Sequence, residues 1–317
     1  MKEALRYLFY GSEGVGKSTL AANSVAPIIF DCEGGSSQLD VTRYTFRDDN
    51  HGHVPESLDE IHAGIEDLRT AEHDFKTLVI DTVSALEALV WDRVCKTHSG
   101  QKGAINKSGK TLSSIEDLGY GKGYTCAVDE FRALCHTLDR LRLERGMSII
   151  LLGHSITKTF KNPISDDYDR IQLRLHDKAA GFVKEWCDVV GYCAFEEGVD
   201  TMASDDRSRP KGYATGFRFV HLERTAAWDA KTRIPLPSKL EMQVGDSWAL
   251  FAAAIATGRD MTASDLRKGI TAELERIGDD ALSAKVGDAV AKVKDQRSVL
   301  SQYFNNLKQR PSAKEAN

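Results

Sequence analysis

Residues 11–19 read GSEGVGKST and contain the full pattern G-x-x-x-x-G-K-[ST]. The apolar residues 4–10 before it predict a buried strand, and helical sequence begins at Lys17. A strand that turns through glycines into a helix aims backbone N–H groups and the positive end of the helix dipole at one point, which suits a chain of phosphates. The sequence therefore predicts a nucleoside triphosphate site formed by Gly11, Ser12, Glu13, Gly14, Val15, Gly16, Lys17, Ser18 and Thr19.

Two side chains of this stretch have defined partners in the expected site. Lys17 should reach the β- and γ-phosphates, and the Ser18 hydroxyl should bind Mg²⁺. Asp81 ends the apolar run TLVID, and a carboxylate at the tip of a buried strand can hold the same ion through water. Capping of the strand end is the other role open to Asp81. The expected cofactors are ATP and Mg²⁺, with Ser18 and Asp81 as the metal-associated residues.

Length and composition limit the classes of protein that the chain can represent. The 317 residues, 41% hydrophobic and 28% charged, allow one large α/β domain with an appendage. No apolar run approaches the roughly 20 residues of a membrane span, so no membrane partner is expected. The six cysteines form no C-x-x-C pair, which is typical of reduced thiols in the cytoplasm. A net charge of −5 argues against indiscriminate coating of nucleic acid but not against a local basic groove.

Apolar runs alternate with stretches of helical spacing, which predicts a mostly parallel sheet covered by helices on both faces. The expected later strands are residues 27–31, 77–81, 147–153 and 189–195, and the expected helices are residues 56–72 and 127–145. Residues 217–222 and 225–230 are expected to pair as a late hairpin. Residues 98–124 and 155–175 lack this rhythm and should be surface loops.

The C-terminal part of the chain has a different composition, rich in Ala, Lys and Asp at helical spacing. Thr262-x-x-Asp265 resembles a capping box, and two successive helices are expected after it, as a helical hairpin. Residues after Pro311 should fray. The sequence thus predicts a nucleotide-binding core over residues 1–245 and a helical C-terminal extension over residues 246–317.

Glu33 lies two residues beyond the end of the expected strand 27–31 and is followed by Gly34 and Gly35. A carboxylate there could orient and deprotonate the water that attacks the γ-phosphate. The residue after Asp81 is Thr82, which cannot serve as such a base. A solvated turn residue is the alternative role for Glu33.

Four segments together resemble the RecA superfamily of recombinases: residues 11–19, IIFDCEGG with Glu33, LVIDTVSAL with Asp81, and IILLGHS with His154. Within it the chain is most similar to short phage-encoded, RecA-like ATPases that act in single-strand annealing or recombination. The resemblance covers about residues 1–245 and implies a RecA-like P-loop core of the α/β class. It implies Glu33 as the catalytic glutamate, Asp81 as the Mg²⁺-associated aspartate, and His154 as the sensor where RecA has glutamine.

The same resemblance implies that the two loops facing the axis of a RecA filament grip DNA. The corresponding lysines here are Lys102, Lys107 and Lys110 in residues 98–124, and Lys158 and Lys161 in residues 155–175. Gly- and Lys-rich loops suit a single strand, because neutralised phosphates and stacked bases give affinity without sequence readout. Two ordinary solvated loops are the alternative.

Lys231-Thr232-Arg233 resembles the finger with which RecA-like and KaiC-like subunits reach a neighbour's γ-phosphate. Lys231 and Arg233 would then act in catalysis together with Lys17, Glu33 and His154. Exposed surface charges are the alternative for this pair.

The sequence therefore predicts a Mg²⁺-dependent ATPase that binds single-stranded DNA and supports annealing or homologous recombination, encoded by a phage. A helicase-type or packaging motor, a small-molecule kinase, and a nucleotide-gated adaptor of a replication complex remain as alternatives. The expected partners are single-stranded DNA, further copies of the chain assembled on it, and single-strand-binding or replication proteins. The expected location is the cytoplasm, that of the host for a phage protein.

Overall fold

The computed structural model describes residues 4–47, 52–98, 112–163, 166–200, 211–242, 246–293, 296–308 and 310. The chain divides into two compact units, residues 1–187 and residues 188–317. Each unit has strands and helices of its own. The expected boundary at residue 245 stays a prediction.

A parallel sheet forms the centre of the first unit. Its strands are β1 (Arg6–Gly11), β2 (Pro27–Asp31), β3 (Thr42–Arg43), β4 (Thr77–Asp81) and β5 (Ser148–Phe160). They lie in the order β3-β2-β4-β5-β1, and every pair in this series is parallel. The inner strands are nearly continuous apolar runs because both faces of the sheet are covered. The expected strands at residues 27–31 and 77–81 are confirmed.

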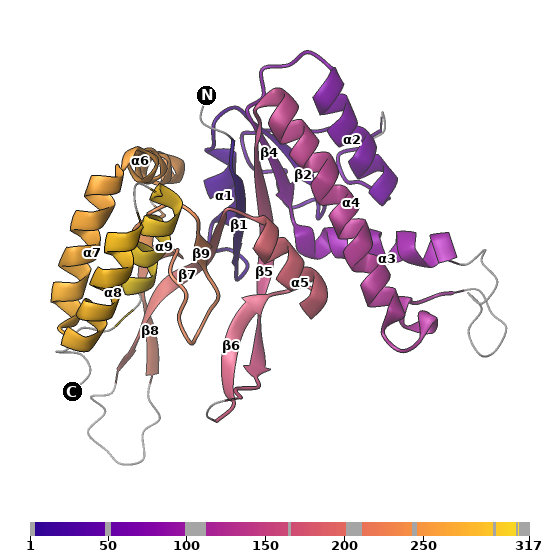
Figure 1. Ribbon diagram of the computed structural model, residues 1–317. Coiled ribbons are helices and arrows are strands. Elements are labelled where there is room, and N and C mark those ends of the chain that lie inside the picture. Colours follow the sequence, from indigo (N-terminus) through magenta and orange to yellow (C-terminus); the bar gives the residue numbers. More distant parts are fainter. Residues whose placement is uncertain are drawn as a thin grey trace. The chain divides into compact units, whose positions relative to one another are not determined.

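Helices of the first unit follow the strands in the chain. They are α1 (Lys17–Ala22), α2 (Leu58–Thr70), α3 (Val83–His98), α4 (Lys122–Arg145) and α5 (Asp177–Trp186), with a 3₁₀ helix at Ile115–Leu118. Helices α2, α3 and α4 pack against one another and lie together beside the sheet (Figure 1). The helix expected at residues 127–145 is confirmed as most of α4, with Phe131, Leu134, Leu138 and Leu141 all buried.

The expected loop at residues 155–175 is wrong, because most of it is a two-stranded hairpin. Strand β5 continues beyond the sheet to Phe160 and pairs antiparallel with β6 (Tyr168–Leu173), as Figure 1 shows. Cross-strand pairs stabilise it: the rings of Phe160 and Tyr168 lie 5.3 Å apart, and the Thr159 hydroxyl donates to Asp169 at 3.0 Å. These residues are polar or half-exposed, so they show no hydrophobic period that would mark a strand.

The second unit contains an antiparallel sheet in the order β9-β7-β8-β10. Its strands are β7 (Val189–Asp200), β8 (Lys211–His221), β9 (Lys231–Thr232) and β10 (Lys239–Glu241). The expected hairpin of residues 217–222 with residues 225–230 is wrong, because β8 pairs with β7 and β10. Residues 225–228 instead form a tight turn, in which the N–H of Thr225 donates to the carbonyl of Trp228 at 3.1 Å.

The C-terminal helices are α6 (Ser247–Asp260), α7 (Ala263–Ile277), α8 (Asp280–Lys292) and α9 (Arg297–Lys308). The capping box of Thr262 and Asp265 is present at the start of α7. The expected second helix is in fact two, α8 and α9, because α8 ends at the extended residue Val293. Helices α7, α8 and α9 share one apolar core. The frayed tail expected after Pro311 lies outside the described residues.

The fold class is therefore α/β, with a mostly parallel central sheet and C-terminal helices, as the sequence predicts. Within the described ranges, no helix has both the length and the apolar character needed to cross a membrane.

Candidate functional site

The register of the parallel sheet gathers the candidate residues at the carboxyl ends of its strands. Gly11 at the end of β1 is opposite His154 of β5, and Asp31 at the end of β2 is opposite Asp81 of β4. Strand β5 lies between β1 and β4. The phosphate loop (residues 11–19) and the carboxylates at the ends of β2 and β4 therefore meet at one edge of the sheet, where α/β sheets bind ligands.

The phosphate loop has the backbone that its glycines predict. Gly14 and Gly16 have φ values of 72° and 99°, in the left-handed region that glycine adopts without a steric penalty. The Lys17 side chain is buried, and its Nζ donates to the carbonyl oxygens of Gly11 at 3.0 Å and Ser12 at 2.7 Å. The ammonium group is thus held over the loop, where it can meet a triphosphate.

Ser18 and Asp81 lie together, and their role as metal ligands stays a prediction. The Ser18 hydroxyl donates to Asp81 Oδ2 at 2.6 Å. Burial, with the nearby carboxylates of Asp31 and Glu33, raises the pKa of Asp81, and the hydrogen bond from Ser18 and the charge of Lys17 oppose this shift. A divalent cation would relieve the crowding of negative charge, so the two groups fit Mg²⁺. No cluster of three His, Cys, Asp or Glu side chains suited to a metal occurs in the described part of the chain. Mg²⁺ commonly takes one or two protein ligands together with phosphate oxygens and water.

Glu33 is held by two side chains distant in sequence, Thr82 just after β4 and His154 in β5. Its Oε1 accepts from the Thr82 hydroxyl at 2.5 Å and from His154 Nε2 at 2.9 Å. His154 Nε2 also lies 3.1 Å from Glu33 Oε2. The Glu33 side chain is about 33% exposed and contacts Thr82, just after β4, and His154 of β5, so its role as the base stays a prediction. Thr82 had no expected role, and no local sequence signal reveals this contact.

Glu13 of the phosphate loop lies near His154 and Arg174, which influence its charge. His154 Nδ1 lies 3.4 Å from Glu13 Oε1 without a hydrogen bond. The N–H of Arg174, just after β6, donates to the His154 carbonyl at 2.9 Å. A backbone hydrogen bond first, then the charges of His154, Lys17 and Arg174, lower the pKa of Glu13. Arg174 was not among the expected site residues, because it follows a strand that the sequence did not predict.

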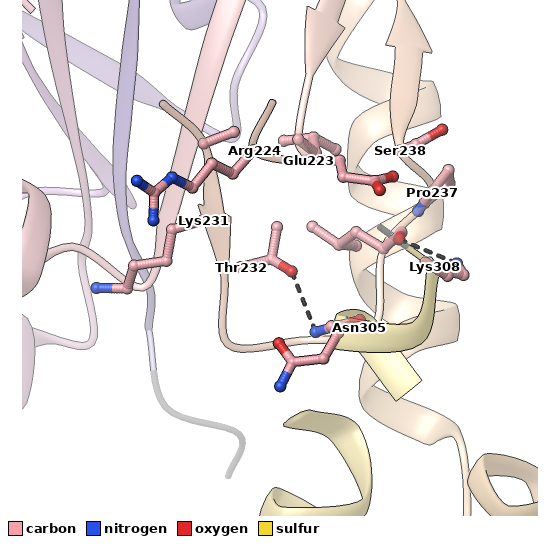
Figure 2. A pocket seen from close by; sticks show the side chains of 12 residues that line it. Glu223, Arg224, Lys231, Thr232, Pro237, Ser238, Asn305 and Lys308 are labelled. Atoms are coloured by element: carbon pink, nitrogen blue, oxygen red, sulfur yellow. Dashed lines mark hydrogen bonds between the residues drawn. The ribbon is translucent and has the colours of Figure 1, made fainter. Parts of the chain in front are cut away.

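The expected finger residues lie in the second unit. Lys231 is in β9, beside a pocket of about 270 Å³ that Arg224, Thr232 and Asn305 also line (Figure 2). Figure 2 shows Lys231 and Arg224 extending to the same side, while Asn305 donates to the Thr232 hydroxyl at 3.4 Å. Arg233 is half-exposed and pairs with Asp188 at 2.7 Å. Their action on a neighbouring site stays a prediction.

The expected DNA-binding lysines fall into two groups. Lys158 pairs with Asp177 at 2.7 Å, and Lys161 pairs with Asp167, both on the surface of the first unit. Lys102, Lys107 and Lys110 lie outside the described residues. DNA contact by either group stays a prediction.

Comparison with protein families matches residues 3–234 to the family described as an AAA domain, a span that includes the phosphate loop, Glu33, Asp81 and His154. Curated proteins give no match. A solved structure described as the crystal structure of the RadB recombinase matches at 11% identity over 70% of this chain and 81% of that chain, with a TM-score of 0.34. A similarity at this level carries no argument about the fold, which is established by the strand order and register. The family match covers well over half of the chain, which therefore belongs to the AAA domain family and is a P-loop ATPase.

Proposed function

We propose that the chain is a Mg²⁺-dependent, RecA-like ATPase in which Glu33 is the general base, and that its hydrolysis is coupled to single-stranded DNA during annealing or recombination. The observation that carries the proposal is the position of the Glu33 carboxylate. It is fixed by Thr82 and His154 at the edge of the sheet that also carries Lys17, Ser18 and Asp81.

The contacts of Glu33 suggest how the base works. Oε1 accepts two hydrogen bonds, while Oε2 has one contact within the described residues, with His154 at the longer distance of 3.1 Å. Oε2 therefore keeps the capacity to take a proton from an attacking water. Lys17 and the N–H groups of the phosphate loop would bind the triphosphate and stabilise the charge that develops on it. Ser18 and Asp81 would hold Mg²⁺, which would supply further neutralisation of the phosphate charge.

The β5–β6 hairpin supports the coupling to single-stranded DNA. His154, which holds Glu33, and Lys158 lie on the same strand, roughly 13 Å apart at the rise of an extended chain. The hairpin also carries the Phe160–Tyr168 ring pair, with the Arg170 guanidinium 5.4 Å above Phe160. Aromatic rings among cations suit a single strand. Phosphates would compete with Asp177 and Asp167 for Lys158 and Lys161.

The test is phosphate release from ATP with and without single-stranded DNA, and with and without Mg²⁺. We expect hydrolysis to need Mg²⁺ and to rise on addition of DNA. Lys158→Gln/Lys161→Gln should weaken DNA binding and flatten its salt dependence by about 0.7 units of the log–log slope per lost phosphate contact. Lys76→Gln is the matched control, since Lys76 is exposed at the opposite end of β4. Hydrolysis that needs Mg²⁺ but ignores DNA would contradict the DNA coupling and leave the ATPase assignment standing.

A further inference from the structure

Asp31, the last residue of β2, carries a buried carboxylate that the proposed mechanism does not use. It is 1% exposed. Its oxygens accept five hydrogen bonds, all from the four residues 33–36 that follow in the chain. At Oδ1 the donors are the N–H groups of Glu33 at 3.2 Å, Gly34 at 2.7 Å and Gly35 at 3.2 Å, and at Oδ2 they are the N–H and hydroxyl of Ser36 at 2.9 and 2.5 Å.

These contacts exclude a direct role in the reaction. Each carboxylate oxygen can accept about two hydrogen bonds through its lone pairs. Oδ1 of Asp31 has three donors and Oδ2 has two, so both oxygens are fully used. Neither oxygen can take a proton from water or coordinate a cation without breaking these bonds. Asp81, the residue opposite Asp31 in the sheet, differs because, among the residues that the structure describes, Ser18 is the single donor to its carboxylate.

We propose that Asp31 is a positioning residue for Glu33, an inference that rests on Glu33 being the general base. Residues 32–36 have no helix or strand of their own, so the Asp31 carboxylate supplies the internal scaffold of this segment. One of its five donors is the backbone N–H of Glu33 itself. The carboxylate thus fixes where the Glu33 backbone leaves β2, and Thr82 and His154 then fix where its side chain ends.

Asp31→Asn tests the proposal because it keeps the size of the side chain and turns one acceptor into a donor that faces other donors. A misplacement of about 1 Å in a reacting group can cost around 100-fold in rate, so we expect kcat to fall by about that factor. The KM for ATP and the affinity for a non-hydrolysable ATP analogue should change by less than about threefold, because Lys17 and Ser18 bind the phosphates from another segment. Asp265→Asn is the control: it also removes a carboxylate that holds local backbone, at the start of α7, and should leave kcat unchanged.

A double-mutant cycle separates positioning from general damage. In the Glu33→Gln background, measured by single-turnover phosphate release, Asp31→Asn should cost almost nothing further, because the group that it positions is already gone. A further loss as large as in the wild-type background, or an unchanged kcat in Asp31→Asn alone, would overturn the proposal. If Asp31→Asn does not fold, Ser36→Ala replaces it, removes a single donor, and should lower kcat about fivefold with the same dependence on Glu33.

The cycle also distinguishes failure of this inference from failure of the proposed function. Wild-type turnover in Glu33→Gln alone would remove Glu33 as the base, and Asp31 would have nothing to position. If Glu33→Gln greatly lowers the rate of phosphate release and Asp31→Asn lowers it by a further, independent factor, Glu33 remains the base. The positioning role of Asp31 is then refuted.

Discussion

Replacing Thr82 by Val should separate two functions of one buried hydroxyl. Thr82 is 1% exposed, and its Oγ1 donates to Glu33 at 2.5 Å while accepting from the N–H of Ala85 at 3.2 Å. The second contact caps the first turn of α3. Valine has nearly the same shape, so the substitution removes the hydroxyl without opening a cavity.

The size of both effects follows from these contacts. A hydrogen bond to a charged group contributes roughly 1.5–3 kcal/mol, and each 1.4 kcal/mol is about a factor of ten. Since His154 still contacts both oxygens of Glu33, we expect the lower end, a decrease of about tenfold in kcat. The lost cap should cost about 1 kcal/mol of unfolding free energy and lower Tm by roughly 2–4 °C.

The assays are steady-state phosphate release, binding of a fluorescent ATP analogue, and thermal unfolding. Affinity for the analogue should stay within about twofold, since neither contact of Thr82 reaches the phosphate loop. Thr82→Ser keeps the hydroxyl and is the control, with turnover and Tm close to wild type. Equal turnover in Thr82→Val and Thr82→Ser would refute the idea that this hydroxyl orients the base.

Further predictions concern binding, assembly and pH. Lys17→Ala should abolish or sharply weaken triphosphate binding while the far-UV circular dichroism stays native; wild-type affinity would contradict the assignment of the nucleotide site. If Lys231 and Arg233 act on a neighbour's nucleotide, a Lys231→Ala/Arg233→Ala chain mixed with a Glu33→Gln chain on single-stranded DNA should regain hydrolysis, because a cation acting in trans can contribute about 10³ to the rate. Co-assembled chains that stay inactive would rule the finger out. Burial lowers the pKa of His62, so the unfolded chain binds more protons just below pH 6.5 and the unfolding free energy should fall there as pH falls. Urea midpoints at pH 7.5 and 5.5 should differ less in His62→Gln, and an identical difference would refute this assignment.

The parts of the fold that the sequence predicts well are those buried on both faces. Strands β2 and β4 appear as unbroken apolar runs that end in aspartate, and the structure places them at the same residues. The outer half of β5 and its partner β6 escape prediction because their stability comes from cross-strand pairs between residues distant in sequence. The hairpin of residues 217–230 fails for a related reason, since a local turn replaces one of its expected strands.

In the candidate site, too, local features are predictable from the sequence and contacts between distant residues are not. The phosphate loop is predictable because a local motif encodes it, and Ser18 and Asp81 are each marked locally, by that motif and by the end of an apolar run, although their contact is not local. The contact between Thr82 and Glu33 joins residues 49 positions apart and depends on β2 lying beside β4, which no local pattern specifies. The ion pair of Arg233 with Asp188 likewise depends on the pairing of β9 with β7.

The most direct test of Glu33 as the general base is single-turnover phosphate release by Glu33→Gln loaded with ATP and Mg²⁺. The variant should bind ATP as the wild type does, because Lys17 and the phosphate loop are intact, and should release phosphate roughly 10²–10⁴-fold more slowly. Glu72→Gln, at an exposed position beyond the end of α2, should match the wild-type rate. Phosphate release by Glu33→Gln at the wild-type rate would mean that another group activates the water.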